Sequence, residues 1–294
     1  MAIPTSLVGT VVAPMEHVVD ERWTMAYAAS LRDHAEAYLD TLRPDGVVAH
    51  PVFAVCPEWP VIVASRHASE AAGVSPAEVI TSVHATHDTT IHRLIQPGDV
   101  LHTSLEFVGL VDKKPGALSS IRLMTVDDTG SPVATTTQHG IYLGVPVDGD
   151  DHPDPDPPVP LEAERVGDPI EIDIGIEAGD AHTYTECARI WNPIHTDRRV
   201  ALDAGLPDII LHGTANLAHG VSQVVAHRAG GDPHLVRRIA GRFGAMVRLP
   251  STMRVRVWPG VSRPDGERVP FEVLNQDDQP AVGNGVVLLG APSA

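Results

Sequence analysis

The segment ARIWNPIHTD, residues 188–197, places an amide and an imidazole three residues apart. An imidazole titrates near neutral pH, so His195 could accept or donate a proton in a reaction. Pro193 fixes a bend directly after Asn192, and this bend would turn both side chains toward one cavity. Farther along, Gly213 begins a strongly helical pattern, and the backbone N–H groups at a helix start can stabilise negative charge.

A segment rich in Asp and Pro, residues 148–168, separates two halves that must position these groups. Its composition disfavours helix and strand, so we expect an interdomain linker there. The N-terminal half then covers residues 1–147 and the C-terminal half covers residues 169–294. The halves resemble each other, because placing residues 27–40 over residues 184–197 aligns a Tyr, an Arg and an Asp in each.

Both halves show a helix followed by several alternating runs, which predicts antiparallel strands wrapped on a helix. The expected strands lie within residues 82–95, 100–111, 118–127, 134–145, 170–179, 237–249, 252–259, 268–275 and 281–290. The clearest helix is 213–231, with Val221, Val224 and Val225 on one face. A shorter helix is expected from Thr196, as its N-cap, to Gly205. The corresponding long helix is not expected in the first half, because prolines interrupt residues 50–73.

The segment 184–218 resembles the signature of the MaoC-like (R)-specific enoyl-CoA hydratase and dehydratase family. Members of this family typically read Gly-Asp-x-Asn-Pro-[Ile/Leu]-His, followed by a short helix and a His-Gly pair. This chain has the Asn-Pro-Ile-His part at 192–195 and the His-Gly pair at 212–213. The resemblance implies an α+β fold of the double hot-dog type, in which two hot-dog halves share one polypeptide.

The resemblance also implies roles in adding water to a 2-enoyl thioester or removing it from a 3-hydroxyacyl thioester. His195 would be the acid/base, Asn192 would position the water or the histidine, and the Gly213 amide would be the oxyanion donor. His212 and Tyr184 would support these groups, and the N-terminal half would hold the acyl tail. Arg242 and Arg248 could bind the phosphates of CoA or of a carrier-protein arm, although solvation at the surface is their commoner use.

The chain departs from the family at Ile190, which falls where the resemblance places a catalytic aspartate. Isoleucine cannot accept a proton, and one positioned acid or base contributes roughly 10²- to 10⁴-fold in rate. Glu186, four residues earlier on one helix face, is the first candidate to replace the aspartate. Asp197 is the second, unless it caps a helix. Asp33 aligns with Ile190 in the repeat, but equivalent sites in a hot-dog pair are usually far apart.

Composition limits the partners. The formal charge of -17 disfavours nucleic acid, and no apolar run is long enough for a membrane span. Two cysteines and no signal-peptide pattern lead us to expect a cytoplasmic protein. Neither a cofactor nor a metal is expected. The histidines at 84, 87 and 92 would not gather, because 87 should point away from the other two on a strand.

Three functions remain open on these grounds. The first is an acyl-thioester lyase acting on a CoA or carrier-protein thioester. The second is a hot-dog enzyme of changed reaction, such as a thioesterase, isomerase or cyclase, because fold alone does not choose among these. The third is a non-catalytic acyl-binding subunit that supports an active partner. A homodimer, or a hetero-oligomer with another hot-dog chain, is expected in each case.

Overall fold

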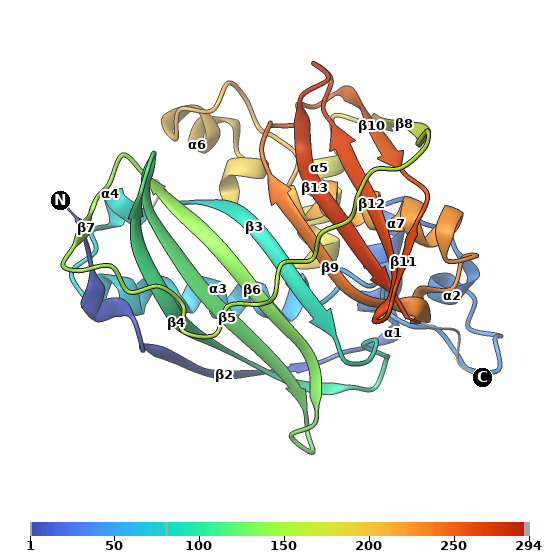
Figure 1. Cartoon of the computed structure of the whole chain (residues 1–294), viewed down its shortest axis with the longest axis horizontal. Coiled ribbons are helices and arrows are strands. Elements are labelled where there is room, and N and C mark those ends of the chain that lie inside the picture. Colours follow the sequence, from blue (N-terminus) through green and yellow to red (C-terminus); the bar gives the residue numbers. More distant parts are fainter. Residues whose placement is uncertain (1, 80–81, 291–294) are drawn as a thin grey trace.

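The computed structural model describes residues 2–79 and 82–290, and its centre is one large antiparallel sheet (Figure 1). The strand order within the described residues is β2-β4-β5-β6-β3-β9-β13-β12-β10-β8, with β11 paired to β12. The strands of this sheet are β2 (Val11–Val18), β3 (Ser82–Ile91), β4 (Val100–Lys113), β5 (Gly116–Asp127), β6 (Pro132–Leu143), β8 (Ile170–Ile176), β9 (Val236–Phe243), β10 (Ser251–Val257), β11 (Val261–Arg263), β12 (Gly266–Leu274) and β13 (Pro280–Leu289). A small parallel pair joins β1 (Ile3–Pro4) to β7 (Val147–Asp148).

The two halves meet where β3 pairs with β9, so their sheets form one continuous surface. Each half wraps its strands around a long helix: α3 (Val55–Ala71) packs on β2 and β4, and α7 (Gly213–Arg228) packs on β9, β10, β12 and β13. This is the expected double hot-dog arrangement. The remaining helices are α1 (Glu21–Ser30), α2 (Glu36–Leu39), α4 (Pro76–Val79), α5 (Asp180–Ala188), α6 (Arg198–Asp203), and the 3-10 turns η1 (Thr5–Leu7), η2 (Pro193–His195) and η3 (Pro233–Leu235).

The long helix α3 contradicts the expectation that the first half lacks one. Pro57 lies in its first turn, where a missing N–H costs little, but Pro60 lies deeper in the helix. The helix persists through Pro60 because one face, including Cys56, Val61 and Ser65, is buried. Burial of that face outweighs the unfavourable propensity of the prolines, so tertiary packing decides this element.

The other expected elements are found with small shifts. The helix expected from residue 213 is α7, ending at Arg228. The short helix is α6, but its N-cap is Asp197 and not Thr196: the Asp197 carboxylate accepts from the N–H groups of Arg199 and Val200 at 2.9 and 3.3 Å. Asp caps well because its short side chain reaches those free N–H groups.

Residues 148–168 run across the outer face of the sheet (Figure 1). Arginines of the strands hold this segment: Arg122 pairs with Asp154 at 3.1 Å, and Arg238 donates to the Val159 carbonyl at 2.7 Å. The strand beneath needs a glycine, because a Cβ on Gly109 would lie 2.7 Å from the Asp154 nitrogen. The segment is therefore extended and attached to both halves along its length.

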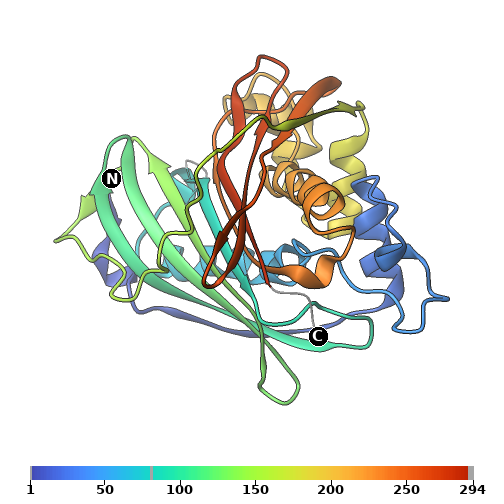
Figure 2. The same ribbon diagram turned by 45° about the vertical axis from the view of Figure 1, so that its right-hand side comes forward.

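Helices α1 and α5 lie side by side and relate the two halves as repeats (Figure 2). Tyr27 of α1 and Tyr184 of α5, 157 residues apart, share a buried hydrogen bond between their hydroxyls at 3.3 Å. A left-handed arginine stands just past the end of each helix: Arg32, with φ 54°, follows the C-cap of α1, and Arg189, with φ 58°, is the C-cap of α5. This local symmetry confirms the repeat and places the end of α5 near the boundary between halves. Within the described residues, no helix has the length and apolar character needed to cross a membrane.

Candidate active site

The segment with the Asn and His begins where α5 ends. Arg189 caps the helix in the left-handed conformation, and the Ile190 N–H bonds back to the Thr185 carbonyl at 3.0 Å. The turn η2 follows directly, closed by a bond of 3.1 Å from the His195 N–H to the Asn192 carbonyl. The chain therefore reverses sharply between α5 and η2, which brings His195 back toward the helix.

His195 is held as a neutral base. It is 9% exposed, and its Nδ1 lies 2.8 Å from the Ile210 carbonyl oxygen. That oxygen can only accept, so Nδ1 carries the proton and Nε2 presents a lone pair. Burial lowers the pKa of His195 to about 4, against the smaller opposite effect of the Ile210 hydrogen bond. At neutral pH the imidazole is therefore unprotonated and able to accept a proton.

His212 lies directly against His195. Their rings are stacked with centroids 3.7 Å apart, and the Nε2 of His212 is 3.2 Å from the Thr185 hydroxyl. Burial, and then the neighbouring His195, lower the pKa of His212 well below its usual value. The Tyr184 ring also packs against His212, with ring centroids 4.9 Å apart, and the Tyr184 hydroxyl donates to the Thr214 hydroxyl at 3.0 Å. Two neutral histidines thus stack in a site supported by Tyr184.

Gly213 is the first residue of α7 and follows His212 directly. Within the described residues, no side chain caps this helix end, and the His212 carbonyl accepts from the N–H groups of Ala215 and Asn216. The N–H groups at the start of a helix have no partner within the helix. A Cβ on Gly213 would lie 3.2 Å from the Phe243 ring, so a side chain there would be tight.

The structure brings some predicted residues together and separates others. His195, His212 and the start of α7 are adjacent, and Asn192 is half-buried at the start of η2. Ile190 is 5% exposed and packs in the main apolar core. Asp197 is occupied as the cap of α6, so its carboxylate serves the helix.

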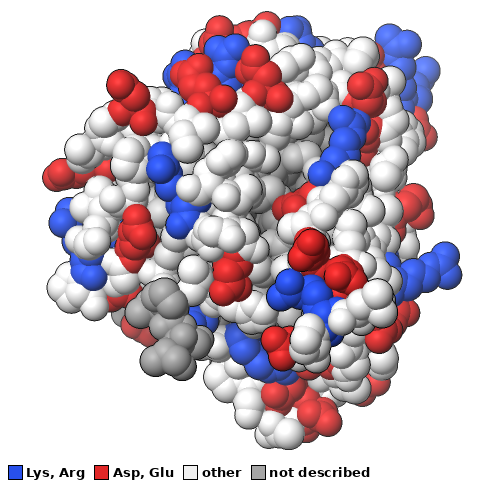
Figure 3. Space-filling view, turned by 90° about the vertical axis from the view of Figure 1, so that its right-hand side faces the viewer, with Lys and Arg blue, Asp and Glu red and all other residues white. Residues whose placement is uncertain are grey.

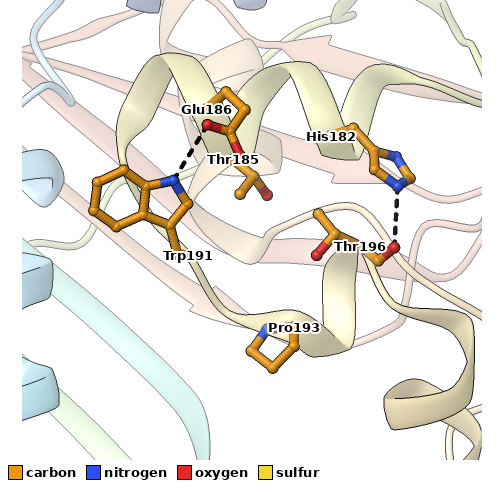
Figure 4. A pocket seen from close by; sticks show the side chains of 6 residues that line it. All are labelled: His182, Thr185, Glu186, Trp191, Pro193 and Thr196. Carbon is orange, nitrogen blue, oxygen red and sulfur yellow. Dashed lines mark hydrogen bonds between the residues drawn. The ribbon is translucent and has the colours of Figure 1, made fainter.

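A cavity of about 270 Å³ opens beside this loop (Figure 4). It is lined by His182, Thr185, Glu186, Trp191, Pro193 and Thr196. Glu186 is exposed there and accepts a bond of 3.4 Å from the Trp191 indole N–H. Asn192, His195 and Gly213 are not among the lining residues. The cavity is connected to the two histidines by Thr185, which lines the cavity and hydrogen-bonds to His212.

Of the two arginines predicted to bind phosphates, Arg248 lies near His195, because its backbone forms a bridge with Ile210, whose carbonyl accepts from the His195 ring. Arg242 is exposed on β9, and Arg248 forms an ion pair with Asp277 at 2.9 Å. The prediction that His87 points away from His84 is wrong. A bulge between His84 and Thr86 shifts the strand by one residue, so the two rings lie 5.5 Å apart. Among the residues described, no group of three or more metal-binding side chains comes together.

Sequence reasoning missed Thr185 and the Ile210 carbonyl, which set the hydrogen bonding of the two histidines. Thr185 could have been found, because the buried residues of α5 are 181, 184, 185 and 188, which is helical spacing. The Ile210 carbonyl carried no signal in the sequence, since any residue type supplies a carbonyl.

Comparison with known proteins agrees with this architecture. Residues 159–275 match the family model described as a MaoC-like domain, and residues 6–136 match the model described as a FAS1-like dehydratase domain region. A relative from Arabidopsis thaliana, named peroxisomal enoyl-CoA hydratase 2, is 35% identical over 68 residues. That match covers 23% of this chain and only 22% of the relative.

Solved structures show the same fold at low sequence identity. A MaoC-like dehydratase from Phytophthora capsici superposes with a TM-score of 0.80 and 17% identity, covering 97% of both chains. A Mycobacterium tuberculosis protein described as a double hotdog fold gives a TM-score of 0.62 and 15% identity, covering 96% of both chains. Both halves thus match dehydratase models, and the fold is shared over nearly the whole length. A MaoC-like domain therefore matches most of the C-terminal half, a FAS1-like dehydratase region matches most of the N-terminal half, and the whole chain has the double hot-dog fold.

Proposed function

We propose that the protein is an acyl-thioester lyase that reversibly hydrates a 2-enoyl thioester to a 3-hydroxyacyl thioester. The observation that carries the proposal is the neutral His195, whose Nε2 lone pair is left free by the bond from Nδ1 to the Ile210 carbonyl. It lies against His212, the residue before the uncapped start of α7. A base next to a source of positive potential suits a reaction that passes through an enolate.

In the hydration direction, His195 Nε2 takes a proton from water while the water oxygen bonds to C3 of the substrate. The electron pair of the double bond moves to the thioester oxygen, and the Gly213 N–H stabilises that charge. The enolate then collapses, and C2 receives a proton from the imidazolium or from a second acid. Asn192 orients the water through its amide. No cofactor is needed, because the reaction moves only water and protons.

Glu186 is the proposed replacement for the carboxylate that the family carries at the position of Ile190. It lines the cavity next to Thr185, and Thr185 bonds His212. The substrate carrier is CoA or a carrier protein, and the acyl tail lies toward the N-terminal half. We expect the protein to act as a homodimer or together with a second hot-dog chain.

A second function is favoured by Ile190 alone. This side chain is 5% exposed in the apolar core, so no acid stands at that position of the loop. A protein with such a loop could bind acyl thioesters and stabilise an active hot-dog partner without catalysis. A hot-dog enzyme of changed reaction, such as a thioesterase, would also keep the neutral His195.

The test compares the parent with His195→Ala on 2-enoyl-CoAs from four carbons upward, following loss of the conjugated absorbance. Because a general base contributes about 10²- to 10⁴-fold, His195→Ala should lower kcat by that factor. His227→Ala is the matched control, since His227 is exposed at the far end of α7. Circular dichroism of each variant checks that the fold is kept.

Three outcomes would contradict the lyase proposal. Release of free thiol without loss of the double bond would indicate hydrolysis. Full activity of His195→Ala would remove the histidine from the mechanism. A parent that is silent on every CoA and carrier-protein thioester, while Ile190→Asp is active, would show that this chain has lost the reaction and would favour the non-catalytic function.

A further inference from the structure

Two arginines occupy equivalent positions in the two halves and have different partners. Arg32 and Arg189 are separated by the same 157 residues as the paired tyrosines Tyr27 and Tyr184, and both have positive φ just past the last residue of their helices. Arg32 of the first half reaches across to α5, where it donates to both oxygens of Asp180 at 2.8 and 2.7 Å. It also donates to the Gly175 carbonyl at 2.9 Å. Its charge is therefore paired with a carboxylate.

The side chain of Arg189 extends in the opposite direction, from α5 toward α1. Its guanidinium lies 3.9 Å from the ring centroid of Trp23, the residue that the repeat places opposite Asp180. A carboxylate in one half is thus replaced by an aromatic face in the other. Across the described part of the chain, no carboxylate lies within ion-pair distance of Arg189 and no acceptor bonds its side chain. The ring attracts the cation but leaves the N–H donors of the guanidinium unused.

Two buried ring nitrogens near Arg189 also have no partner among the described residues. Trp23 is 3% exposed and its indole N–H is buried without an acceptor among the described residues. The Nε2 of His17, whose ring is 6.3 Å from that of Trp23, is likewise buried without a partner. Burial first, and then the charge of Arg189, lower the pKa of His17, so this ring is neutral near pH 7 and adds no second positive charge.

A partly buried cation with unused donors is costly unless an anion joins it. We propose that Arg189, with the indole N–H of Trp23, binds a carboxylate carried by the acyl group of the substrate. The ligand class is then a thioester of a dicarboxylic acid. Arg189 is followed directly by Ile190, so the anion would lie next to the proposed catalytic loop. The loop has a cation beside the position where its family carries an acid, which suits an anionic acyl group.

This proposal rests on the proposed function in taking the ligand to be an acyl thioester. A carrier phosphate offers similar chemistry, but Trp23 is almost fully buried. A small carboxylate on the acyl chain fits that burial better than the strongly hydrated phosphate groups of CoA. The test separates the two sources.

The experiment measures binding of saturated thioesters, which a hydratase cannot turn over, by titration calorimetry. Glutaryl-CoA and valeryl-CoA have acyl chains of equal length that end in a carboxylate and a methyl group, respectively. The parent should bind glutaryl-CoA at least tenfold more tightly. Arg189→Gly should weaken glutaryl-CoA binding about 10- to 100-fold, because a charge-assisted hydrogen bond is lost, and should leave valeryl-CoA nearly unchanged.

Arg32→Gly is the matched control, since it changes the equivalent left-handed position and removes an arginine that already has a carboxylate. Glycine accepts positive φ, so both variants should keep the fold. Arg32→Gly should keep the preference for glutaryl-CoA. Equal weakening of free CoA by Arg189→Gly would assign the arginine to a carrier phosphate and overturn the proposal. If Arg189→Gly changed no affinity, Arg189 would only connect the two helices, and the proposal would also be overturned.

The two proposals can fail separately. Selective glutaryl-CoA binding in a protein that hydrates no enoyl thioester would refute the lyase proposal and support the Arg189 site. Hydration of unsubstituted enoyl-CoAs, with glutaryl-CoA and valeryl-CoA bound equally well, would support the lyase proposal and refute the Arg189 site.

Discussion

At the scale of single residues, burial sets the charge of the groups in this protein. Glu58 lies fully buried on α3, where its Oε1 accepts a short hydrogen bond from the Thr136 hydroxyl. Its Oε2 has no partner among the described residues. Burial raises the pKa of Glu58 to about 8, against the opposite effect of the Thr136 bond. The folded protein therefore holds this carboxyl neutral near pH 7.

Replacing Glu58 by Gln should stabilise the protein at pH 7.5. A raised pKa means that the stabilising effect of the carboxyl is complete below its unfolded pKa and is lost as pH rises toward 8. Glutamine keeps the shape and stays neutral, so the gain should be about 1–3 kcal/mol at pH 7.5 and near zero at pH 4.5. Urea unfolding at both pH values measures it, with Glu70→Gln at the exposed end of α3 as the control. A gain that is independent of pH would contradict the argument.

At the scale of elements, close approach of helix and sheet decides what α7 tolerates. Gly220 lies in the middle of α7, and a Cβ there would overlap the Phe271 ring of β12, coming within 2.7 Å of its Cδ2. Helix propensity alone would favour alanine by about 1 kcal/mol. The packing of α7 on β12 requires the glycine instead, because neither the helix nor the ring has room to move in a dense core.

Gly220→Ala should therefore destabilise the protein by about 1–3 kcal/mol, the usual cost of overpacking a core. The matched control is Gly175→Ala on β8, where a Cβ would meet nothing within 4 Å. Thermal and urea unfolding of both variants would test this. A Gly220→Ala variant as stable as the parent would show that α7 can shift away from the sheet.

At the scale of the whole molecule, charge is distributed as an outer layer around neutral buried groups. Figure 3 shows acidic and basic side chains interspersed at the rim of one face, with a largely uncharged region between them. Inside, burial is the largest cause of a pKa lowered to about 4 for four histidines: His50, His84, His195 and His219. These residues come from both halves, so both halves should respond to acid.

Stability should therefore fall steeply as pH drops from about 6.5 toward 4. A depressed histidine pKa means that the unfolded chain binds more protons than the folded one in this range. Each such histidine contributes a slope of up to about 1.4 kcal/mol per pH unit. Urea unfolding between pH 7.5 and 5 should show a slope that decreases when His50 is replaced by Gln. A free energy of unfolding that is flat across this range would mean that the histidines are accessible to protons when folded.

Much of the fold could be predicted from residue pattern alone. Alternating apolar residues indicated the strands, and the spacing of Val221, Val224 and Val225 indicated α7. The motif at 192–195 with the pair at 212–213 indicated the loop and the helix start that face each other. These features depend on local periodicity and on residue type, which are properties of the sequence and do not depend on the fold.

Other features depended on contacts between distant segments. Helix α3 forms through Pro60 because burial against the sheet outweighs local propensity. The His84–His87 contact needs a bulge set by pairing with β6. The free lone pair of His195 depends on the Ile210 carbonyl, and the unused donors of Arg189 depend on Trp23. The sequence by itself determined most of the strands, helix α7 and which residue types meet near the loop. The tertiary structure alone decided protonation and partners, because burial and hydrogen bonding are properties of surroundings that only folding assembles.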